Sequence, residues 1–115
     1  MLFICYKKCS TCQKVEKILQ EKEVAYDYRK IDQDNPTAQE LKAWHEKSGL
    51  DIKKFFNTSG RIYREKNLKD KLETMSLEEK YDLLATDGML VKRPIILEGD
   101  QVYVGPLAKK YVEGL

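Results

Sequence analysis

The sequence predicts a small α/β fold, and three observations along its 115 residues support this prediction. Near the start, two β-rich runs flank a helical pattern, as in a strand–helix–strand unit. The middle of the chain carries several helical patterns with little β character. Near the end, two further β-rich runs surround a Gly-Asp turn, and one helical pattern follows them. The expected order is therefore β α β, a helical block, and β β α, with a mixed sheet.

The first strand–helix–strand unit is the part of the chain that carries the cysteines. Residues 2–6 form a short apolar run rich in strand formers, which predicts a buried strand. A helix is expected over Ser10–Lys22, because residues 10–13 have the form of a capping box. Residues 25–31 have the mixed alternation of a second strand. Since one helix joins the two strands, the crossover should be right-handed and the strands parallel.

The helical block is marked by two further capping boxes, which begin at Thr37 and Ser76. Gly49 follows the first helical pattern and predicts its end, because glycine readily adopts the left-handed conformation at a helix C-terminus. Residues 67–73 predict another short helix. Residues 55–60 place two aromatic rings before turn residues, which predicts a loop anchored by two buried side chains.

The last part of the chain predicts an antiparallel hairpin and a closing helix. Residues 94–97 and 102–104 are rich in strand-forming side chains, and residues 98–101 between them contain the turn. From Pro106 onward, apolar residues recur at helical spacing, and proline is favoured at the first position of a helix. These elements complete one predicted domain over residues 1–115, a length that commonly forms a single compact unit.

Composition and charge exclude several functional classes. The 21 basic and 19 acidic side chains are mixed along the chain and leave a formal charge of +2, so no basic surface for nucleic acid is expected. No apolar run approaches the roughly 20 residues that cross a membrane, and the opening residues do not have the order of a signal peptide. We therefore expect a cytoplasmic protein, in a compartment that keeps thiols reduced.

Cys9 and Cys12 form a Cys-x-x-Cys motif where the first strand leads into the first helix. Such a motif in a cytosolic βαβ unit is typical of thioredoxin-like redox proteins. The unpaired N–H groups and partial positive charge of a helix N-terminus favour a thiolate, and Lys7 and Lys8 add positive charge. Cys9 is therefore the predicted nucleophile. Cys12, three residues further and on the same side of the helix, is the predicted resolving thiol.

The third cysteine and the single histidine are not expected to take part in the chemistry. A zinc site would need four ligands, and only Cys5 and His45 remain to complete one, so no metal is predicted. Cys5 is expected in the core, because free cysteine behaves as a small apolar side chain. His45 is expected on the surface, whereas the rings of Trp44, Phe55 and Phe56 are expected in the core.

Arg93 precedes Pro94 at the start of the third predicted strand. A bond before proline can be cis, which would turn the backbone sharply here and could direct the guanidinium toward the thiolate. An arginine so placed would stabilise a thiolate or bind an anionic substrate through forked hydrogen bonds. A surface arginine before an ordinary trans proline is the alternative, and these two residues alone do not decide between them.

A resemblance to a known family rests on residues 9–12 (CSTC), 55–60 (FFNTSG), 68–71 (LKDK) and 87–95 (DGMLVKRPI). In these segments the chain resembles the arsenate reductase-like family of thioredoxin-fold proteins, which includes ArsC, Spx and an uncharacterised reductase-like branch that this chain resembles most. The resemblance implies a thioredoxin-like fold with a helical insertion at about 36–88, between the second and third strands. It also implies a cis peptide before Pro94 and an Arg93 that faces Cys9.

Arsenate reductases of this family use one catalytic cysteine and several arginines that bind the oxyanion, so the resemblance implies catalytic roles for Cys9 and Arg93. This chain departs from that pattern, because only Arg61 or Arg64 matches the mid-chain arginine and residues 104–106 replace the C-terminal one. Fewer guanidinium groups predict weaker binding of a doubly charged oxyanion. The residues expected to support the site are Lys8, Ser10, Thr11, Pro94 and Arg61.

Three functions are compatible with these features. The first and most favoured is a thiol–disulfide oxidoreductase, with glutathione or thioredoxin as the electron donor and no bound cofactor. The second is a redox-sensing transcriptional regulator that binds RNA polymerase, as the resemblance to Spx implies. The third is an arsenate reductase. Because one fold serves many functions, the fold alone does not choose among them.

Overall fold

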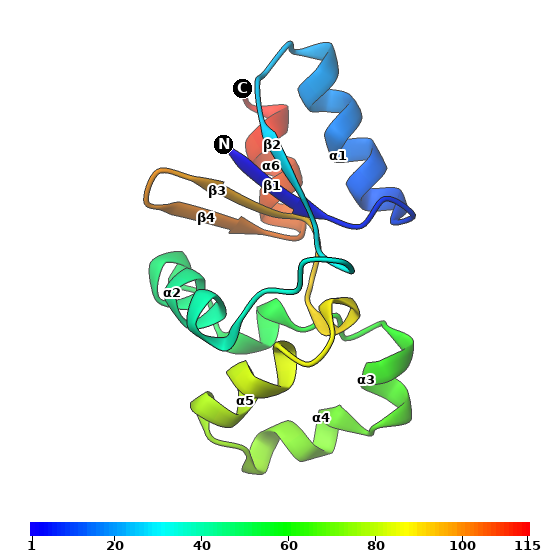
Figure 1. Ribbon diagram of the computed structural model, residues 1–115, viewed down its shortest axis with the longest axis vertical. Helices are drawn as coiled ribbons and strands as arrows, with labels where there is room; N and C mark the ends of the chain where they lie inside the picture. The colour runs from blue at the N-terminus through cyan, green and yellow to red at the C-terminus, as the bar shows by residue number, and fades with distance from the viewer.

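The computed structural model describes residues 1–115 and contains one four-stranded mixed sheet (Figure 1). Its strands are β1 (Leu2–Cys5), β2 (Asp27–Lys30), β3 (Ile95–Glu98) and β4 (Gln101–Val104). They lie in the order β2-β1-β3-β4, so the first strand of the chain is central. β1 is parallel to β2 and antiparallel to β3, and β3 and β4 form the hairpin. The predicted element order and the parallel first pair are confirmed.

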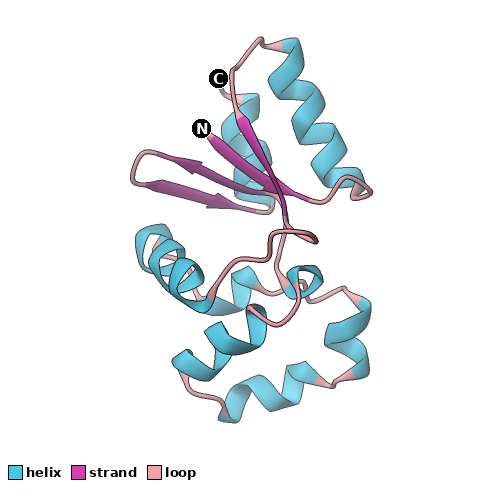
Figure 2. Cartoon of the chain, in the orientation of Figure 1, coloured by secondary structure: helices cyan, strands magenta, loops and turns pink.

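Helices gather in two regions of the molecule, one beside the sheet and one at its far end (Figure 2). The region beside the sheet consists of α1 (Ser10–Glu21) and α6 (Pro106–Glu113). The other region is the helical insertion between β2 and β3, in the lower half of Figure 1. Its elements are α2 (Ala38–Ser48), η1 (Ile52–Phe55), α3 (Arg61–Glu65), α4 (Leu68–Lys71), η2 (Leu72–Thr74), α5 (Leu77–Leu84) and η3 (Gly88–Leu90).

Alternation along the strands gives the sheet two apolar faces. Phe3, Cys5 and Ile96 point to one face, where they pack with residues of α1 and α6. Ile4 and Ile95 belong to the other core, which the insertion completes. All five side chains are fully buried. The sheet therefore separates two cores, and Cys5 lies in the one beneath α1.

The start of α1 differs from the predicted capping box. Cys9, rather than Ser10, is the N-cap residue, and no side chain caps the helix. The N–H of Cys9 donates to the carbonyl of Tyr6 at 3.0 Å, and the Gln13 side chain donates to the Lys7 carbonyl at 2.8 Å. Because this tight turn follows β1 at once, Ser10 is already helical and the capping box at residues 10–13 does not form.

The other helix signals are confirmed in the insertion. Thr37 and Ser76 each form a complete capping box with the glutamate three residues later. Gly49 ends α2 in the left-handed conformation, with φ at 68°. Residues 67–73 contain α4 and the start of η2. The structure adds the five-residue α3, which was not predicted.

The two aromatic residues predicted to be buried tie the insertion to the segment that returns to the sheet. Phe55 and Phe56 are 0% and 1% exposed. Phe56 forms an isolated antiparallel bridge with Val91, and the Lys92 N–H donates to the Phe55 carbonyl at 2.8 Å. This pairing fixes the backbone directly before Arg93.

Arg29 of β2 joins the sheet to α2. Its guanidinium donates two hydrogen bonds to the Glu40 carboxylate, at 2.6 and 2.9 Å, and its Nε lies 3.2 Å from the Asp34 carboxylate. It also lies over the ring of Trp44, which is buried as predicted. The hydrogen bond from Arg29 is the main reason that the pKa of Glu40 is lowered to about 2. The ion pair therefore stays formed across the neutral and mildly acidic range.

Replacing Glu40 with glutamine should lower the free energy of unfolding at pH 7 by about 1 kcal/mol, a value reduced for solvent screening because Glu40 is 36% exposed. Glutamine still accepts from the Thr37 N–H, so the change removes the charge that faces Arg29. Since the folded pKa lies below the unfolded value of about 4.3, this stabilisation is present above that pH and disappears as the pH falls toward 2. Urea unfolding at pH 7 and pH 3 measures the effect.

Glu79→Gln is the matched control for this experiment. Glu79 occupies the same place in the Ser76 capping box but has no arginine partner. We expect it to change the free energy of unfolding at pH 7 less than Glu40→Gln does. Equal losses would mean that the capping boxes, and not the pair with Arg29, account for the effect.

Candidate thiol site

Cys9 lies where β1 ends and α1 begins. Its backbone is extended, with φ at −81° and ψ at 123°, and its carbonyl accepts a helical hydrogen bond from the Gln13 N–H at 3.0 Å. The side chain is partly buried and packs against the core beneath α1. The thiol is therefore held at the positive end of a 12-residue helix.

A disulfide that the sequence analysis did not predict lies directly behind this thiol. Cys5, the last residue of β1, is bonded to Cys12 in the first turn of α1, and their Cα atoms are 5.9 Å apart. The two residues are 0% and 2% exposed, whereas Cys9 keeps a free thiol. The predicted burial of Cys5 is confirmed. The resolving role of Cys12 stays a prediction, because its bonded partner in this structure is Cys5 and not Cys9.

Two periodicities explain this pairing. Alternation along β1 places Cys5 on the face that α1 covers. Helical periodicity places Cys12 on the buried side of α1, in line with Val15 and Leu19. Neither position looks special in the local sequence, since the bond depends on how the helix docks on the strand. The signal that predicts such a bond is a cysteine on the buried face at the end of a strand, followed by a second cysteine on the buried face of the next helix.

Of the two lysines next to Cys9, Lys7 contacts partners other than the thiol. The Nζ of Lys7 lies 4.0 Å from the centre of the Tyr28 ring and 3.8 Å from the Glu16 carboxylate. Lys8 is exposed. Burial, together with the negative charges of Glu16 and Asp32, raises the pKa of Tyr28 to about 12. Tyr28 therefore keeps its proton at neutral pH and presents a neutral ring to this side of the site.

The guanidinium of Arg93 lies beside Tyr6, the residue that opens the turn before Cys9. The Arg93–Pro94 bond is cis, as the resemblance implied. The guanidinium carbon lies 5.6 Å from the centre of the Tyr6 ring, and the Tyr6 carbonyl accepts the N–H of Cys9. Nη1 reaches the Met89 carbonyl only at 3.5 Å, and Nε is buried with no partner. The guanidinium thus keeps N–H groups for an anion.

The remaining predicted support residues are spread over the molecule. Ser10 and Thr11 are exposed on the first turn of α1. Pro94 is buried, and its carbonyl accepts from the Gly105 N–H at 2.8 Å, which joins it to the turn before α6. Arg61 is 84% exposed and pairs with the next turn of its own helix, through Glu65 at 2.7 Å. The structure gives Arg61 no contact with the thiols.

The prediction that His45 lies on the surface is wrong. The ring is partly buried in the insertion, with Nε2 2.8 Å from the Leu50 carbonyl and Nδ1 2.6 Å from the Tyr81 hydroxyl. It also packs edge-on against Phe55. The carbonyl can only accept, so Nε2 donates to Leu50, and Nδ1 shares a hydrogen bond with the Tyr81 hydroxyl. The charged neighbours of His45 in the sequence concealed this role, because its partners come from other elements.

A groove of about 650 Å³ opens between the insertion and the turn from β4 to α6. Its lining combines three lysines, Lys53, Lys54 and Lys92, with apolar side chains that include Leu50 and Leu107. This volume lies in the range of roughly 300–1,000 Å³ typical of small-molecule sites. Lys92 directly precedes Arg93 in the chain, whereas neither Arg93 nor a cysteine lines the groove. Sequence analysis missed it because its lysines come from distant segments.

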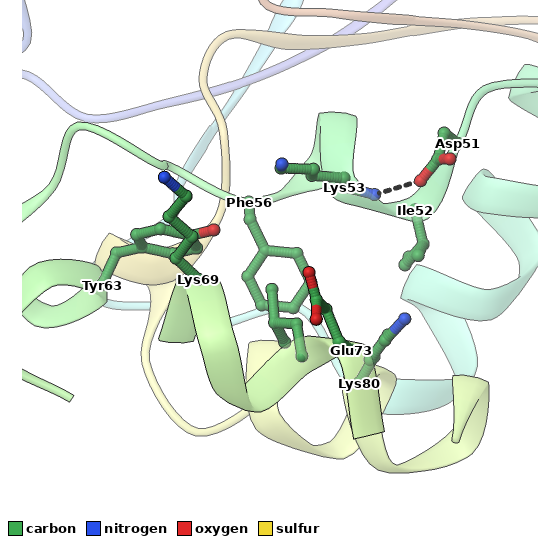
Figure 3. A pocket seen from close by; sticks show the side chains of 9 residues that line it. Asp51, Ile52, Lys53, Phe56, Tyr63, Lys69, Glu73 and Lys80 are labelled. Carbon is green, nitrogen blue, oxygen red and sulfur yellow. Dashed lines mark hydrogen bonds between the residues drawn. The ribbon is translucent and has the colours of Figure 1, made fainter. Parts of the chain in front are cut away.

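A smaller cavity of about 170 Å³ lies within the insertion (Figure 3). Its lining includes Lys69, Lys80 and Glu73 together with the rings of Phe56 and Tyr63. No cysteine lines it. Elsewhere, no three His, Cys, Asp or Glu side chains gather closely enough to hold a metal ion, and none of the helices has the length and apolar character needed to cross a membrane.

Comparison with known proteins identifies the family. Residues 5–113 match the family model described as ArsC family. The chain belongs to the ArsC family. A curated relative, the uncharacterized protein YusI of Bacillus subtilis, is 52% identical over 105 residues, which cover 91% of this chain and 89% of YusI. The global transcriptional regulator Spx of Staphylococcus aureus is 26% identical over 97 residues, covering 84% of this chain and 72% of Spx.

Solved structures of ArsC-family relatives confirm the thioredoxin-like α/β fold. An ArsC-family-related protein from Bacteroides fragilis superposes with a TM-score of 0.89 and 51% identity, covering 96% of this chain and 95% of that one. A structure from Streptococcus mutans, described as a possible arsenate reductase, superposes with a TM-score of 0.85 and 44% identity, covering 91% of this chain and 89% of that one. The relatives of this chain thus include a protein described as a possible arsenate reductase and a global transcriptional regulator.

Alkylation without reductant should label the oxidised protein at one position, Cys9, because the other two sulfurs are bonded and buried. Iodoacetamide treatment followed by mass measurement should show one adduct on the wild type and none on Cys9→Ser. After reduction and denaturation the wild type should accept three adducts. Labelling of Cys5 in the unreduced wild type would contradict the assignment.

Proposed function

We propose that this ArsC-family protein is a cytoplasmic thiol–disulfide oxidoreductase that uses glutathione or a thioredoxin-type protein as electron donor. The observation that carries the proposal is the position of Cys9, a free and partly exposed thiol at the N-cap of α1. A helix N-terminus stabilises negative charge on sulfur, and thiol exchange begins with a thiolate. A reducible cysteine pair directly behind Cys9 supports the same chemistry.

The reaction begins at Cys9. Its thiolate attacks one sulfur of a substrate disulfide, so that a Cys9–substrate disulfide forms, the substrate S–S bond breaks and the first substrate thiolate leaves. In the fully reduced protein, the thiolate of Cys12 then attacks the sulfur of Cys9 and displaces the second substrate thiol. The substrate gains two electrons and the protein loses two, in the form of a disulfide. Two thiols of the donor return the protein to the reduced state.

Arg93 is proposed to bind an anionic group of the substrate or donor. Its Nε has no partner in the protein, and its bond to the Met89 carbonyl is long at 3.5 Å. Leaving a buried donor unpaired costs about 1–3 kcal/mol, and a carboxylate would remove this cost through a charge-assisted bond. Glutathione carries such carboxylates, and the Lys92 side of the groove offers further positive charge.

Replacing Cys9 with serine should abolish reduction of hydroxyethyl disulfide by glutathione, because a hydroxyl does not form the mixed disulfide. Turnover coupled to glutathione reductase measures the effect, and the same assay with a thioredoxin system identifies the donor. Cys12→Ser should keep more activity than Cys9→Ser, since external glutathione can take over the resolving step. Wild-type protein that turns over with neither donor would contradict the proposal.

The groove can be tested in the same assay. Lys92→Glu should raise the KM for glutathione several-fold, because the change replaces an attractive charge with a repulsive one. Lys69→Glu is the matched control, since Lys69 lines the smaller cavity in the insertion instead. An equal KM change in both variants would show that only the net charge of the protein matters.

A redox-sensing regulator is the second candidate, and the similarity to Spx favours it. In this role the thiol state of the cysteines would control binding to RNA polymerase. Oxidised and reduced protein, immobilised separately, should retain RNA polymerase to different extents if the regulator function holds. Failure of both forms to retain it removes this candidate.

Arsenate reduction has weaker support from the site. The chain carries Cys9 and Arg93, the two residues that match the family pattern, and the Streptococcus mutans relative is described as a possible arsenate reductase. However, Arg61 is exposed and paired with Glu65, and the C-terminal arginine expected of such enzymes is absent. Oxidation of glutathione that depends on added arsenate would establish this activity.

A further inference from the structure

We propose that Cys5 is a third redox-active cysteine, which takes the disulfide from Cys9–Cys12 and stores it as the buried Cys5–Cys12 bond. This inference deepens the proposed function and rests on it. It assigns chemistry to a residue that the sequence marks only as a core position. Its consequence is that the protein can be oxidised and still present a free nucleophile.

The first argument is accessibility. The sulfurs of Cys5 and Cys12 belong to residues that are 0% and 2% exposed and lie between β1, α1 and α6. An external thiol such as glutathione cannot reach either of them without opening the core, and opening a core costs much of the global stability. A bond so placed would exchange slowly if it depended on external thiols alone.

The second argument is that Cys9 offers an internal route. Cys9 is the N-cap of α1 and Cys12 is the third residue of its first turn, the position that an N-cap side chain commonly reaches. Cys9 is partly exposed and also packs against the core that contains the bond. It is therefore the one cysteine with access both to solvent and to the neighbourhood of Cys12.

The exchange balances without any outside reagent. The thiolate of Cys5 attacks the Cys12 sulfur of a Cys9–Cys12 disulfide, the Cys5–Cys12 bond forms and Cys9 leaves as a thiolate. The reverse step returns the bond to Cys9–Cys12, where a donor thiol can attack the exposed sulfur of Cys9. The fully reduced protein starts with three thiols. After one substrate disulfide has been converted to two thiols, the protein contains one disulfide and one thiol.

The chain offers a direct way to follow this exchange. Trypsin cleaves after Lys7, Lys8 and Lys14, so Cys5 lies in peptide 1–7, whereas Cys9 and Cys12 share peptide 9–14. A Cys9–Cys12 bond closes peptide 9–14 on itself. A Cys5–Cys12 bond links the two peptides and leaves Cys9 free for alkylation. Tandem mass spectrometry of acid-quenched, alkylated digests distinguishes these products.

Reduced wild-type protein should therefore be mixed with one equivalent of oxidised glutathione and sampled over time. We expect the internally closed peptide 9–14 first and the linked peptides, with the adduct on Cys9, at the end. In Cys5→Ala the reaction should stop at the closed peptide, and Cys9 should resist alkylation. We call the transfer of the disulfide from Cys9–Cys12 to Cys5–Cys12 the relay. An end point in the wild type with Cys9–Cys12 bonded and Cys5 alkylated overturns it.

The return direction is tested on the oxidised protein. Glutathione should reduce the Cys5–Cys12 bond at least about tenfold more slowly in Cys9→Ser than in the wild type, because the exposed entry point is lost. Equal rates would mean that Cys9 is not the route. Thermal melting of both variants establishes that they are folded, and Cys5→Ser repeats the first test with a side chain of nearly unchanged size.

These outcomes separate the relay from the proposed function. Wild-type turnover that requires Cys9, together with a Cys9–Cys12 end point, leaves the oxidoreductase in place and removes only the relay. The expected sequence of disulfides without turnover by either donor leaves the relay in place and removes the oxidoreductase.

Discussion

The hydrogen bond from the Cys9 N–H to the Tyr6 carbonyl holds the turn on which the thiol site depends. It closes the chain directly after β1, so that α1 begins one residue later and lies back over the strand it has just left. A longer connection would let the helix start elsewhere. With this turn, Cys9 becomes the N-cap, and Cys12 is placed above Cys5. The arrangement of all three sulfurs follows from one short turn beside a central strand.

The insertion is a second unit of packing, and three attachments fix it to the sheet. The pair of Arg29 with Glu40 joins β2 to α2, and the bridge between Phe56 and Val91 joins the end of η1 to the segment that leads into β3. At Gly88 the chain passes so close to the end of β2 that an added Cβ would overlap a backbone carbonyl. These contacts set the approach to the cis bond at Arg93, and hence the position of the guanidinium.

Local sequence signals predicted those parts of the structure that local forces determine. The capping boxes at Thr37 and Ser76, the glycine stop after α2 and the hairpin all formed, because each depends on a few neighbouring residues. The predicted capping box at Ser10 did not form, because the turn from Tyr6 to Cys9 makes Cys9 the N-cap residue instead. The five-residue α3, which has no side-chain cap, was not predicted.

The candidate site was predictable only in part, for a related reason. Helix polarity is enough to nominate Cys9, and the family resemblance is enough to expect the cis bond before Pro94. The Cys5–Cys12 bond, the partners of His45 and the lysine groove all join residues from separate elements, so they appear only when those elements are packed. Periodicity predicts that a side chain is buried but does not identify its neighbour.

The short loop closed by the Cys5–Cys12 disulfide also makes the stability of the fold depend on oxidation. The two residues are seven positions apart, and closing a loop of that size lowers the free energy of the folded state relative to the unfolded chain by roughly 2.5 kcal/mol in a simple chain-entropy model. Oxidation thus braces the central strand against its helix. The melting temperature of the protein therefore reports whether the Cys5–Cys12 pair is oxidised or reduced.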